Sequence, residues 1–210
     1  MWSDLETDAR RHSLAAERNA AYILAALQRL LPKSGLLLEV ASGTGQHAAL
    51  CSVGLPGWTW LPSDADAAAL QSIRSWCAGR PNVMQPLQLD VLQPQWPGVP
   101  AQVDAIFCAN MIHIAPWACC KGLFEVAERH LAAEGLLITY GPYLEAEVPT
   151  APSNLAFDMD LRALDAQWGI RRREEVELVA AQAGLALCDR VAMPANNLLL
   201  VWGRSKSACL

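Results

Sequence analysis

The chain has 210 residues, of which 53% are apolar and 18% are charged, so it is long enough and apolar enough for a globular domain and not a disordered chain. A net charge of −5 at pH 7, without a basic cluster, excludes nucleic acid as an expected partner. No apolar stretch approaches the ~18–20 residues that cross a bilayer, and the N-terminus lacks a signal-peptide pattern, so we expect a cytoplasmic protein without a membrane partner. Seven cysteines without a CxxC pair indicate reduced thiols and no metal site.

The first half of the chain alternates between helices and strands. An amphipathic helix is predicted at residues 15–31, with Ser13 as its capping residue and Pro32 at its end. Strands follow at residues 36–40, 58–63, 83–89 and 103–109, and helices separate the first three of them at residues 46–53 and 66–78.

The second half of the chain begins with a predicted helix at residues 117–133 and a strand at residues 136–140. Residues 141–171 then break the pattern with prolines and aromatic side chains, and an interval of this length is typical of a functional lid. A helix at residues 172–183 and an antiparallel hairpin of residues 185–192 and 197–202 complete a single domain over residues 1–204, followed by a tail at residues 205–210. This alternation predicts an α/β fold with a mostly parallel sheet and helices on both of its faces.

A glycine-rich turn after the first strand carries the strongest functional signal. Gly43 and Gly45 stand directly before a helix N-terminus, where the backbone can approach a ligand and free N–H groups face it. Asp64 follows the second strand, about 20 residues after the glycines, where an acid can bind ribose hydroxyls. Glu39 precedes the turn, where an acid suits a ligand with hydroxyls or positive charge. Together these residues predict an adenosine-containing cofactor, although the turn alone also permits a nicotinamide dinucleotide.

Short stretches along the chain carry a wider pattern: Ala15-Ala-Glu-Arg-Asn19, Ala41-Ser-Gly-Thr-Gly-Gln-His47, Pro62-Ser-Asp64, Ala109-Asn-Met-Ile-His-Ile114, Pro116-Trp117, Tyr140-Gly-Pro-Tyr143, Pro152-Ser-Asn154, Trp168-Gly-Ile-Arg171 and Met193-Pro-Ala-Asn-Asn197. On these stretches the sequence resembles the class I S-adenosylmethionine-dependent methyltransferases, and more narrowly the family that contains methyltransferase-like protein 26. The resemblance runs from about Ser13 to Arg204.

The resemblance implies a Rossmann-like methyltransferase fold, with a seven-stranded sheet in the order 3-2-1-4-5-7-6 and an antiparallel last strand. It also implies S-adenosylmethionine as the cofactor. Asp64 corresponds to the ribose-binding acid, Asp90 to an acid on the adenine side, and Asn110 to a position near the methionine part. The cofactor-binding residues that it implies are Glu39, Ala41, Gly43, Gly45, Asp64, Asp90, Val91 and Asn110, with Ala41 standing where many members have a glycine.

The expected function is methyl transfer to a small-molecule acceptor. His113, which follows the fourth strand, is the predicted general base, and both His113 and Tyr143 are expected to face the transferred methyl group. Arg18 is predicted to bind the methionine carboxylate of the cofactor. The residues predicted to line the substrate side are Tyr140, Asn154, Asp158 and Trp168.

Several of these assignments have a structural alternative. His113 can instead pack the start of the following helix, Tyr140 and Trp168 can be core residues, and Arg18 can be an exposed helix charge. Two other functions also stay open. One is a protein that binds S-adenosylmethionine without turnover, and the other is a nicotinamide-dependent oxidoreductase, against which the lack of a Tyr-x-x-x-Lys pair argues.

Overall fold

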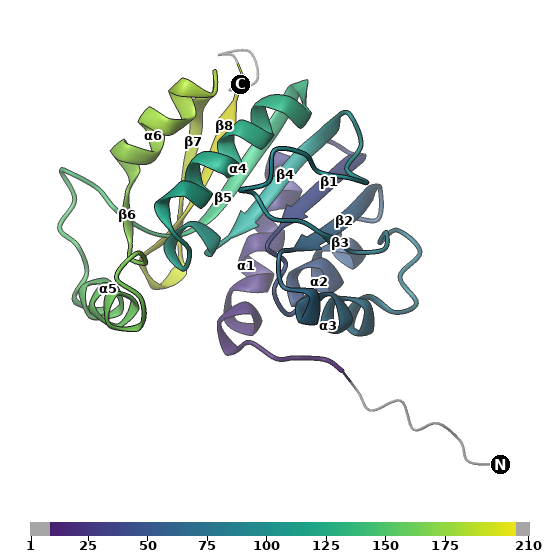
Figure 1. The fold of residues 1–210 in the computed structure, drawn as a ribbon, viewed down its shortest axis with the longest axis horizontal. Coiled ribbons are helices and arrows are strands. Elements are labelled where there is room, and N and C mark those ends of the chain that lie inside the picture. Colours follow the sequence, from purple (N-terminus) through teal and green to yellow (C-terminus); the bar gives the residue numbers. More distant parts are fainter. Residues whose placement is uncertain (1–8, 205–210) are drawn as a thin grey trace.

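A mixed β-sheet with helices on both faces forms the centre of the molecule (Figure 1). The computed structural model describes residues 9–204, so the tail expected at residues 205–210 lies outside the described residues. No helix within residues 9–204 is long and apolar enough to cross a bilayer. The elements in chain order are α1 (Leu14–Leu30), β1 (Gly35–Val40), α2 (Gln46–Gly54), β2 (Trp58–Asp64), α3 (Ala67–Cys77), β3 (Leu87–Gln88), β4 (Val103–Ala109), η1 (Met111–His113), α4 (Trp117–His130), β5 (Leu131–Leu144), α5 (Pro152–Leu164), β6 (Arg171–Arg172), α6 (Arg173–Gln182), β7 (Ala186–Met193), η2 (Pro194–Asn196) and β8 (Asn197–Gly203).

The strands of the sheet lie in the order β3-β2-β1-β4-β5-β8-β7, and β6 pairs with β5 outside this path. β8 runs antiparallel to β5 and to β7, whereas the other pairs are parallel. The predicted strand order is confirmed, because β8 and β7 occupy the places of the expected seventh and sixth strands. The sheet has eight strands and not seven, since the short β6 pairs with Tyr143 and Leu144 at the end of β5.

Each face of the sheet buries its own apolar core. α1, α2 and α3 cover one face, where Ile23, Trp60 and Phe107 are fully buried. α4 and α6 cover the other face, where the rings of Phe124 and Trp202 pack edge to face with centroids 5.2 Å apart. Because β4 lies between both cores, its sequence is almost continuously apolar.

β3 is shorter than the strand predicted at residues 83–89. Only Leu87 and Gln88 form a strand, while Val83 makes an isolated bridge to Trp60. Pro86 lies between these two contacts, and a proline has no N–H to donate to a neighbouring strand. The interruption therefore follows from the sequence.

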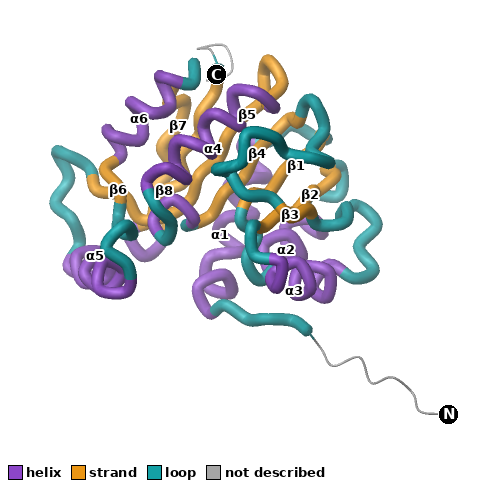
Figure 2. Tube along the Cα trace, in the orientation of Figure 1, coloured by secondary structure: helices purple, strands orange, loops and turns teal. Residues whose placement is uncertain are grey.

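The interval predicted as a lid contains a helix that the sequence analysis did not predict. β5 continues to Leu144, and α5 then begins with Pro152 in its first turn. Figure 2 shows α5 set apart from the sheet, between two loops. Within α5 only Asn154 and Leu161 are buried, so contacts with neighbouring loops must hold this helix in place.

Candidate functional site

The turn between β1 and α2 has a left-handed backbone at three positions. Ala41, Gly43 and Gly45 have φ angles of 56°, 57° and 89°. A Cβ at Gly45 would lie 2.7 Å from the Cα of Ile73, so this position has no room for a side chain. A Cβ at Gly43 would meet no atom within 4 Å, because Gly43 faces a cavity. Ala41 keeps the left-handed conformation although it carries a Cβ, at a cost of about 1–2 kcal/mol.

Asp64 is held at the end of β2 by two backbone donors. The Gly43 N–H donates to its Oδ2 at 2.8 Å, and the Asp66 N–H donates to its Oδ1 at 2.9 Å. Each carboxylate oxygen has a further lone pair, so Asp64 can still accept hydrogen bonds from two ligand hydroxyls. The turn and the acid are thereby fixed to each other before a ligand arrives.

A cavity of about 280 Å³ lies over this turn, at the C-terminal ends of β1, β2 and β4. It brings together five of the residues predicted to bind the cofactor: Ala41, Gly43, Asp64, Asp90 and Val91. The rest of its wall is apolar or small: Val40, Ala65, Leu89, Ala109, Met111, Ile114, Ala115 and Cys119. Two acids beside an apolar wall suit a ligand that carries both hydroxyl groups and a flat ring.

Glu39 lies beneath the turn and not in the cavity wall, which corrects the prediction of a direct cofactor contact. Its side chain is 1% exposed, and Trp60 Nε1 donates a hydrogen bond to its Oε2 at 2.8 Å. Burial raises the pKa of Glu39 to about 7, against the lowering effect of hydrogen bonds from Trp60 and Ser42. Glu39 therefore supports the turn from behind.

A larger cleft of about 810 Å³ adjoins the cavity, and Ile114 lines both. Residues of α1, α5 and η2, together with residues at the ends of β4 and β5, form its walls. Four of the predicted site residues lie here: Arg18, Asn110, Tyr140 and Asn154. The other lining residues besides Ile114 are Ser13, Ala15, Asn19, Tyr22, Pro142, Ser153, Phe157, Pro194, Ala195 and Asn197.

Asn110 and Arg18 occupy distinct parts of this cleft. Asn110 has a left-handed backbone with φ of 63°, and its N–H donates to the Tyr140 carbonyl at 2.7 Å, so the chain turns sharply where β4 ends. It directly follows Ala109, a residue of the cavity wall, and so stands at the junction of cavity and cleft. Arg18 is exposed on α1, and within residues 9–204 its guanidinium has no ion-pair partner.

A buried polar link joins α1, α2 and β5 beside the cleft. His47 Nε2 donates to Asn19 Oδ1 at 2.7 Å, and Asn19 also hydrogen bonds with the Tyr140 side chain. Burial lowers the pKa of His47 to about 4, so the ring is neutral at pH 7. Burial also raises the pKa of Tyr140, while the hydrogen bond with Asn19 opposes that shift. The link holds α1 in the position from which Arg18 reaches the cleft.

His113 lies inside the fold, contrary to the prediction that it faces the transferred methyl group. Its side chain is 1% exposed, and its Nδ1 accepts a hydrogen bond from the Arg171 N–H at 3.3 Å. A Cβ at Gly141 would lie 2.6 Å from His113 Nε2, so β5 packs directly against the ring. Burial lowers the pKa of His113 to about 3, which makes it a weak base. His113 is therefore a packing residue, as the structural alternative expected, but it packs against Gly141 and Tyr143 of β5.

Tyr143 is also buried, and this corrects its predicted catalytic position. It is 5% exposed, its hydroxyl donates to Thr139 Oγ1 at 2.9 Å, and its ring packs edge to face against His113. Burial raises the pKa of the Tyr143 hydroxyl. Tyr143 therefore packs in the apolar core between the sheet and the helices α4 and α6.

Asp158 and Trp168 are structural residues of the lid interval and not part of the cleft wall. Both oxygens of the Asp158 carboxylate accept hydrogen bonds from the lid interval: Oδ2 accepts from Arg162 Nε at 2.8 Å, and Oδ1 accepts from the Ile170 N–H at 2.7 Å. Trp168 is half-buried in the loop after α5, where its N–H donates to the Asp165 carbonyl at 3.0 Å. Neither residue lines the cleft, which corrects the prediction that Asp158 and Trp168 contact the substrate.

Three exposed apolar side chains of the cleft were not predicted. Tyr22, Ile114 and Phe157 are 53%, 44% and 43% exposed. A helical spacing from predicted residues could have found two of them, because Tyr22 is four residues after Arg18 and Phe157 is three residues after Asn154.

The chain matches, over residues 10–204, a family described as "Protein of unknown function (DUF938)". It is also similar to solved structures of methyltransferases. With CalO1, a methyltransferase in calicheamicin biosynthesis in its SAH-bound form, the TM-score is 0.72 at 20% identity, over 91% of this chain and 55% of that chain. With the mitomycin 7-O-methyltransferase MmcR, the TM-score is 0.77 at 14% identity, over 91% of this chain and 54% of that chain.

Human N-acetylserotonin methyltransferase in complex with SAM gives a TM-score of 0.75 at 14% identity, over 91% of this chain and 53% of that chain. The chain thus spans about half the length of these solved structures. At such identities the likeness establishes the shared fold, and the chemistry must be argued from the site.

Proposed function

The chain belongs to the DUF938 family, and we propose that it transfers a methyl group from S-adenosylmethionine to a small-molecule acceptor. The observation that carries this proposal is the pair of adjoining pockets at the C-terminal ends of the strands, with Ile114 in the wall of both. In open α/β sheets ligands bind at this edge, where the strand order reverses. One pocket has the chemistry for an adenosine cofactor, and the other has room for an acceptor beside it.

The residues of the smaller cavity fit the adenosine part of S-adenosylmethionine. Asp64 has two oxygens with free lone pairs for the ribose hydroxyls, and Gly43 leaves open space above the turn. On the adenine side, the acid Asp90 lies beside apolar surface from Leu89 and Met111. CalO1 and N-acetylserotonin methyltransferase, which share this fold, were solved with SAH and SAM respectively.

The methionine part would extend into the larger cleft, where Arg18 and Asn110 lie. An exposed guanidinium without an ion-pair partner can bind a carboxylate through two parallel hydrogen bonds. We also infer the narrower kinship with the family of methyltransferase-like protein 26 from the motifs in the sequence. A cytoplasmic location and the lack of a nucleic-acid partner remain predictions from composition.

S-adenosylmethionine supplies a methyl group on a positively charged sulfur, from which an acceptor can displace it in line. The role of the chain is then to align the acceptor, and alignment of two reactants can contribute roughly 7–11 kcal/mol. Asn110 stands at the junction of the two pockets, where the acceptor atom would lie. Tyr22 and Phe157 offer apolar surface that can hold the acceptor and displace water. We infer that residues 141–171 act as a lid, since α5 supplies Phe157 and Asn154 to this wall.

Calorimetric titration of S-adenosylmethionine tests the cofactor assignment. Asp64→Ala removes the acceptors for two ribose hydroxyls, so we expect a loss of roughly 1.5–3 kcal/mol in binding, or at least about tenfold in affinity. Asp66→Ala is the matched control, because this acid stands two residues away and caps α3 with its side chain. Equal affinities of wild type and Asp64→Ala would refute the ribose assignment.

Turnover needs a second measurement. Incubation of the protein with S-adenosylmethionine and a metabolite extract should produce S-adenosylhomocysteine and one extract component heavier by one methyl group, both detected by mass spectrometry. Tight binding without either product would support a protein that binds the cofactor without turnover.

A further inference from the structure

Arg171 connects the end of the lid interval to the loop after β4. Its Nε donates to the Ile112 carbonyl at 2.9 Å, and one terminal nitrogen donates to the Ala115 carbonyl at 2.8 Å. The same nitrogen donates to the Gln167 carbonyl at 2.7 Å, and the guanidinium carbon lies 5.4 Å from the centroid of the Trp117 ring. One side chain thus joins three backbone carbonyls from two segments that are about 50 residues apart in sequence.

Two more hydrogen bonds join the same segments. The Gly169 N–H donates to the His113 carbonyl at 2.9 Å, and the Arg171 N–H donates to His113 Nδ1 at 3.3 Å. The buried position of His113 therefore belongs to this junction. Four hydrogen bonds thus link residues 112–115 to residues 169–171.

α5 is attached to these linked segments through Ile170. The Ile170 N–H donates to Asp158 Oδ1 at 2.7 Å, and the Asp158 carboxylate also holds Arg162 on the next turn of α5. Since only Asn154 and Leu161 of α5 are buried, this contact is a major part of what positions the helix. A displacement of residues 167–171 would therefore displace the cleft wall that α5 forms.

Residues 110–115 also contribute to both pockets. Met111, Ile114 and Ala115 line the cavity, and Asn110 and Ile114 line the cleft. The Arg171 guanidinium itself lies on the far side of this loop, in a surface groove with Trp117 and Glu175. Any effect of Arg171 on a ligand must therefore act through the loop.

We propose that Arg171 is a positioning residue that couples the cofactor cavity to α5: it fixes residues 110–115 as the shared wall of the two pockets and, through Ile170 and Asp158, ties that wall to the helix over the acceptor cleft. This inference rests on the proposed function in one respect, since it takes S-adenosylmethionine as the ligand of the cavity. The adenosine part would bind in the cavity, which α5 does not line, whereas the methionine part would bind in the cleft, which α5 does line. The coupling is therefore measured with variants of Arg171 and Asp158, which line neither pocket.

Hydrogen exchange measured by mass spectrometry, together with calorimetry, tests the coupling. In the wild-type chain, S-adenosylmethionine should slow amide exchange in residues 152–164. In Arg171→Ala, cofactor affinity should fall about tenfold, because charge-assisted hydrogen bonds that hold the cavity wall are lost, and the cofactor should no longer slow exchange in α5. Arg171→Lys retains the charge and can satisfy some of the carbonyls, so it should restore part of both effects.

Two variants separate coupling from general destabilisation. Arg172→Ala changes the exposed neighbour of Arg171 and should preserve both the affinity and the slowed exchange. Asp158→Ala should leave cofactor affinity within about twofold of wild type but abolish the slowing in α5, because it cuts the chain of contacts beyond residues 110–115. If Arg171→Ala does not fold, Asp158→Ala and Arg171→Lys still test the coupling, since each has its own expected effect on amide exchange in α5.

Unchanged affinity and unchanged slowing in Arg171→Ala would overturn the proposal. So would a loss of affinity with the slowing in α5 intact, since that result describes a residue that only stabilises the fold. A wild-type chain that binds the cofactor without slowing exchange in α5 would overturn the coupling while leaving the proposed function intact. A wild-type chain that does not bind S-adenosylmethionine would refute the proposed function itself, and the coupling with it.

Discussion

Glu39 is a buried acid directly beneath the turn that shapes the smaller cavity. Burial disfavours its charged form and raises its pKa to about 7, while the Trp60 indole N–H and Ser42 partly compensate. In the unfolded chain the same carboxyl group has its ordinary pKa of 4.5. Between these two values the folded state binds more protons than the unfolded state, so the contribution of Glu39 to stability falls as pH rises.

Glu39→Gln should therefore change the pH dependence of stability. The variant keeps the shape and cannot ionise, so its free energy of unfolding relative to wild type should rise by about 2–3 kcal/mol between pH 5 and pH 8. Urea unfolding at several pH values measures this difference. Titration of His47 and His113 changes the stability of both proteins equally, so it cancels in the comparison. Glu134→Gln, at an exposed acid, is the control. Parallel pH profiles for wild type and Glu39→Gln would contradict the raised pKa.

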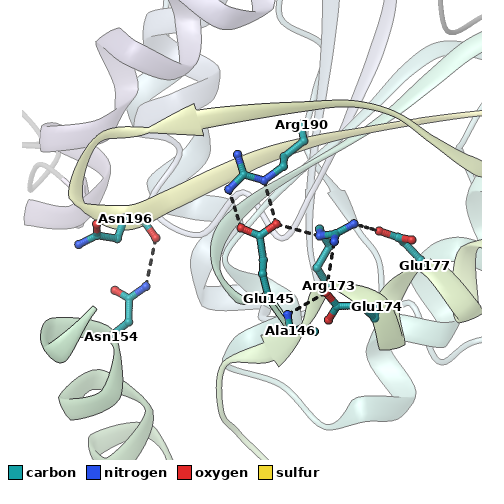
Figure 3. Close-up of polar contacts among 8 residues, drawn as sticks. All are labelled: Glu145, Ala146, Asn154, Arg173, Glu174, Glu177, Arg190 and Asn196. Carbon is teal, nitrogen blue, oxygen red and sulfur yellow. Dashed lines mark hydrogen bonds and ion pairs between the residues drawn. The ribbon is translucent and has the colours of Figure 1, made fainter. Parts of the chain in front are cut away.

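At the scale of elements, the chain after β5 is held by a charged cluster (Figure 3). The side chain of Glu145 is 8% exposed, and its Oε1 accepts from Arg173 Nε on α6 at 2.9 Å and from Arg190 Nε on β7 at 2.8 Å. The Ala146 N–H donates to Glu174 Oε1 at 3.0 Å. These contacts fix the point where the lid interval leaves the sheet, and Asn154 Nδ2 then reaches the Asn196 carbonyl at 3.1 Å.

Glu145→Gln should lower the free energy of unfolding by roughly 1–2 kcal/mol at pH 7, since it leaves the half-buried Arg173 and the more exposed Arg190 without their shared carboxylate. The hydrogen bond from Arg190 holds the pKa of Glu145 below its usual value of 4.5. This stabilisation is therefore fully present above pH 4.5 and is lost as pH falls further, so the difference in stability between the two proteins should be smaller at pH 3 than at pH 7. Chemical unfolding at both pH values measures the effect. Glu177→Gln, which also removes a partner of Arg173 but at a more exposed acid, should cost less.

Most elements could be predicted because their local signals agree with their packing. Ser13 caps α1 as predicted, and β4 has the predicted bounds. α5 was missed because the prolines at 149 and 152 look like a loop, although a proline in the first turn of a helix is also a normal start. Tyr143 was misplaced because β5 is buried on both faces near its end, so no alternation of polar and apolar residues shows which side each residue faces.

At the scale of the whole molecule, the sequence locates the edge where ligands bind but not the division of that edge into two pockets. Parallel strands place Gly43, Asp64 and Asn110 at one edge, because each lies at or just after the C-terminal end of a strand. The larger cleft needs residues 13–22 at the start of α1, residues 153–157 of α5 and residues 194–197 around η2. These three segments come together only through tertiary contacts, which no local pattern in a single sequence encodes.

The two glycines of the turn provide matched variants for a test of the whole molecule. Gly43→Ala adds a methyl group in open space at the cavity wall, so the chain should fold with a loss of about 1–2 kcal/mol from the left-handed backbone alone. Gly45→Ala forces a Cβ to within 2.7 Å of the Ile73 backbone, so it should lower the melting temperature much more. The first variant should block the proposed ligand, and the second should disturb the fold.

S-adenosylmethionine at about 100 times its Kd should stabilise the wild-type chain by about 2.7 kcal/mol, because it binds the folded state alone. For a chain of this size the melting temperature should rise by roughly 5–10 °C. In Gly43→Ala the shift should largely disappear at the same concentration, since the added methyl group occupies space above the turn. NAD should give no comparable shift with wild type, because the proposed function assigns the cavity to an adenosine and the cleft beyond it to a methionine and an acceptor, and neither pocket to a nicotinamide. A larger shift with NAD than with S-adenosylmethionine would replace the methyltransferase proposal with a nicotinamide-dependent one.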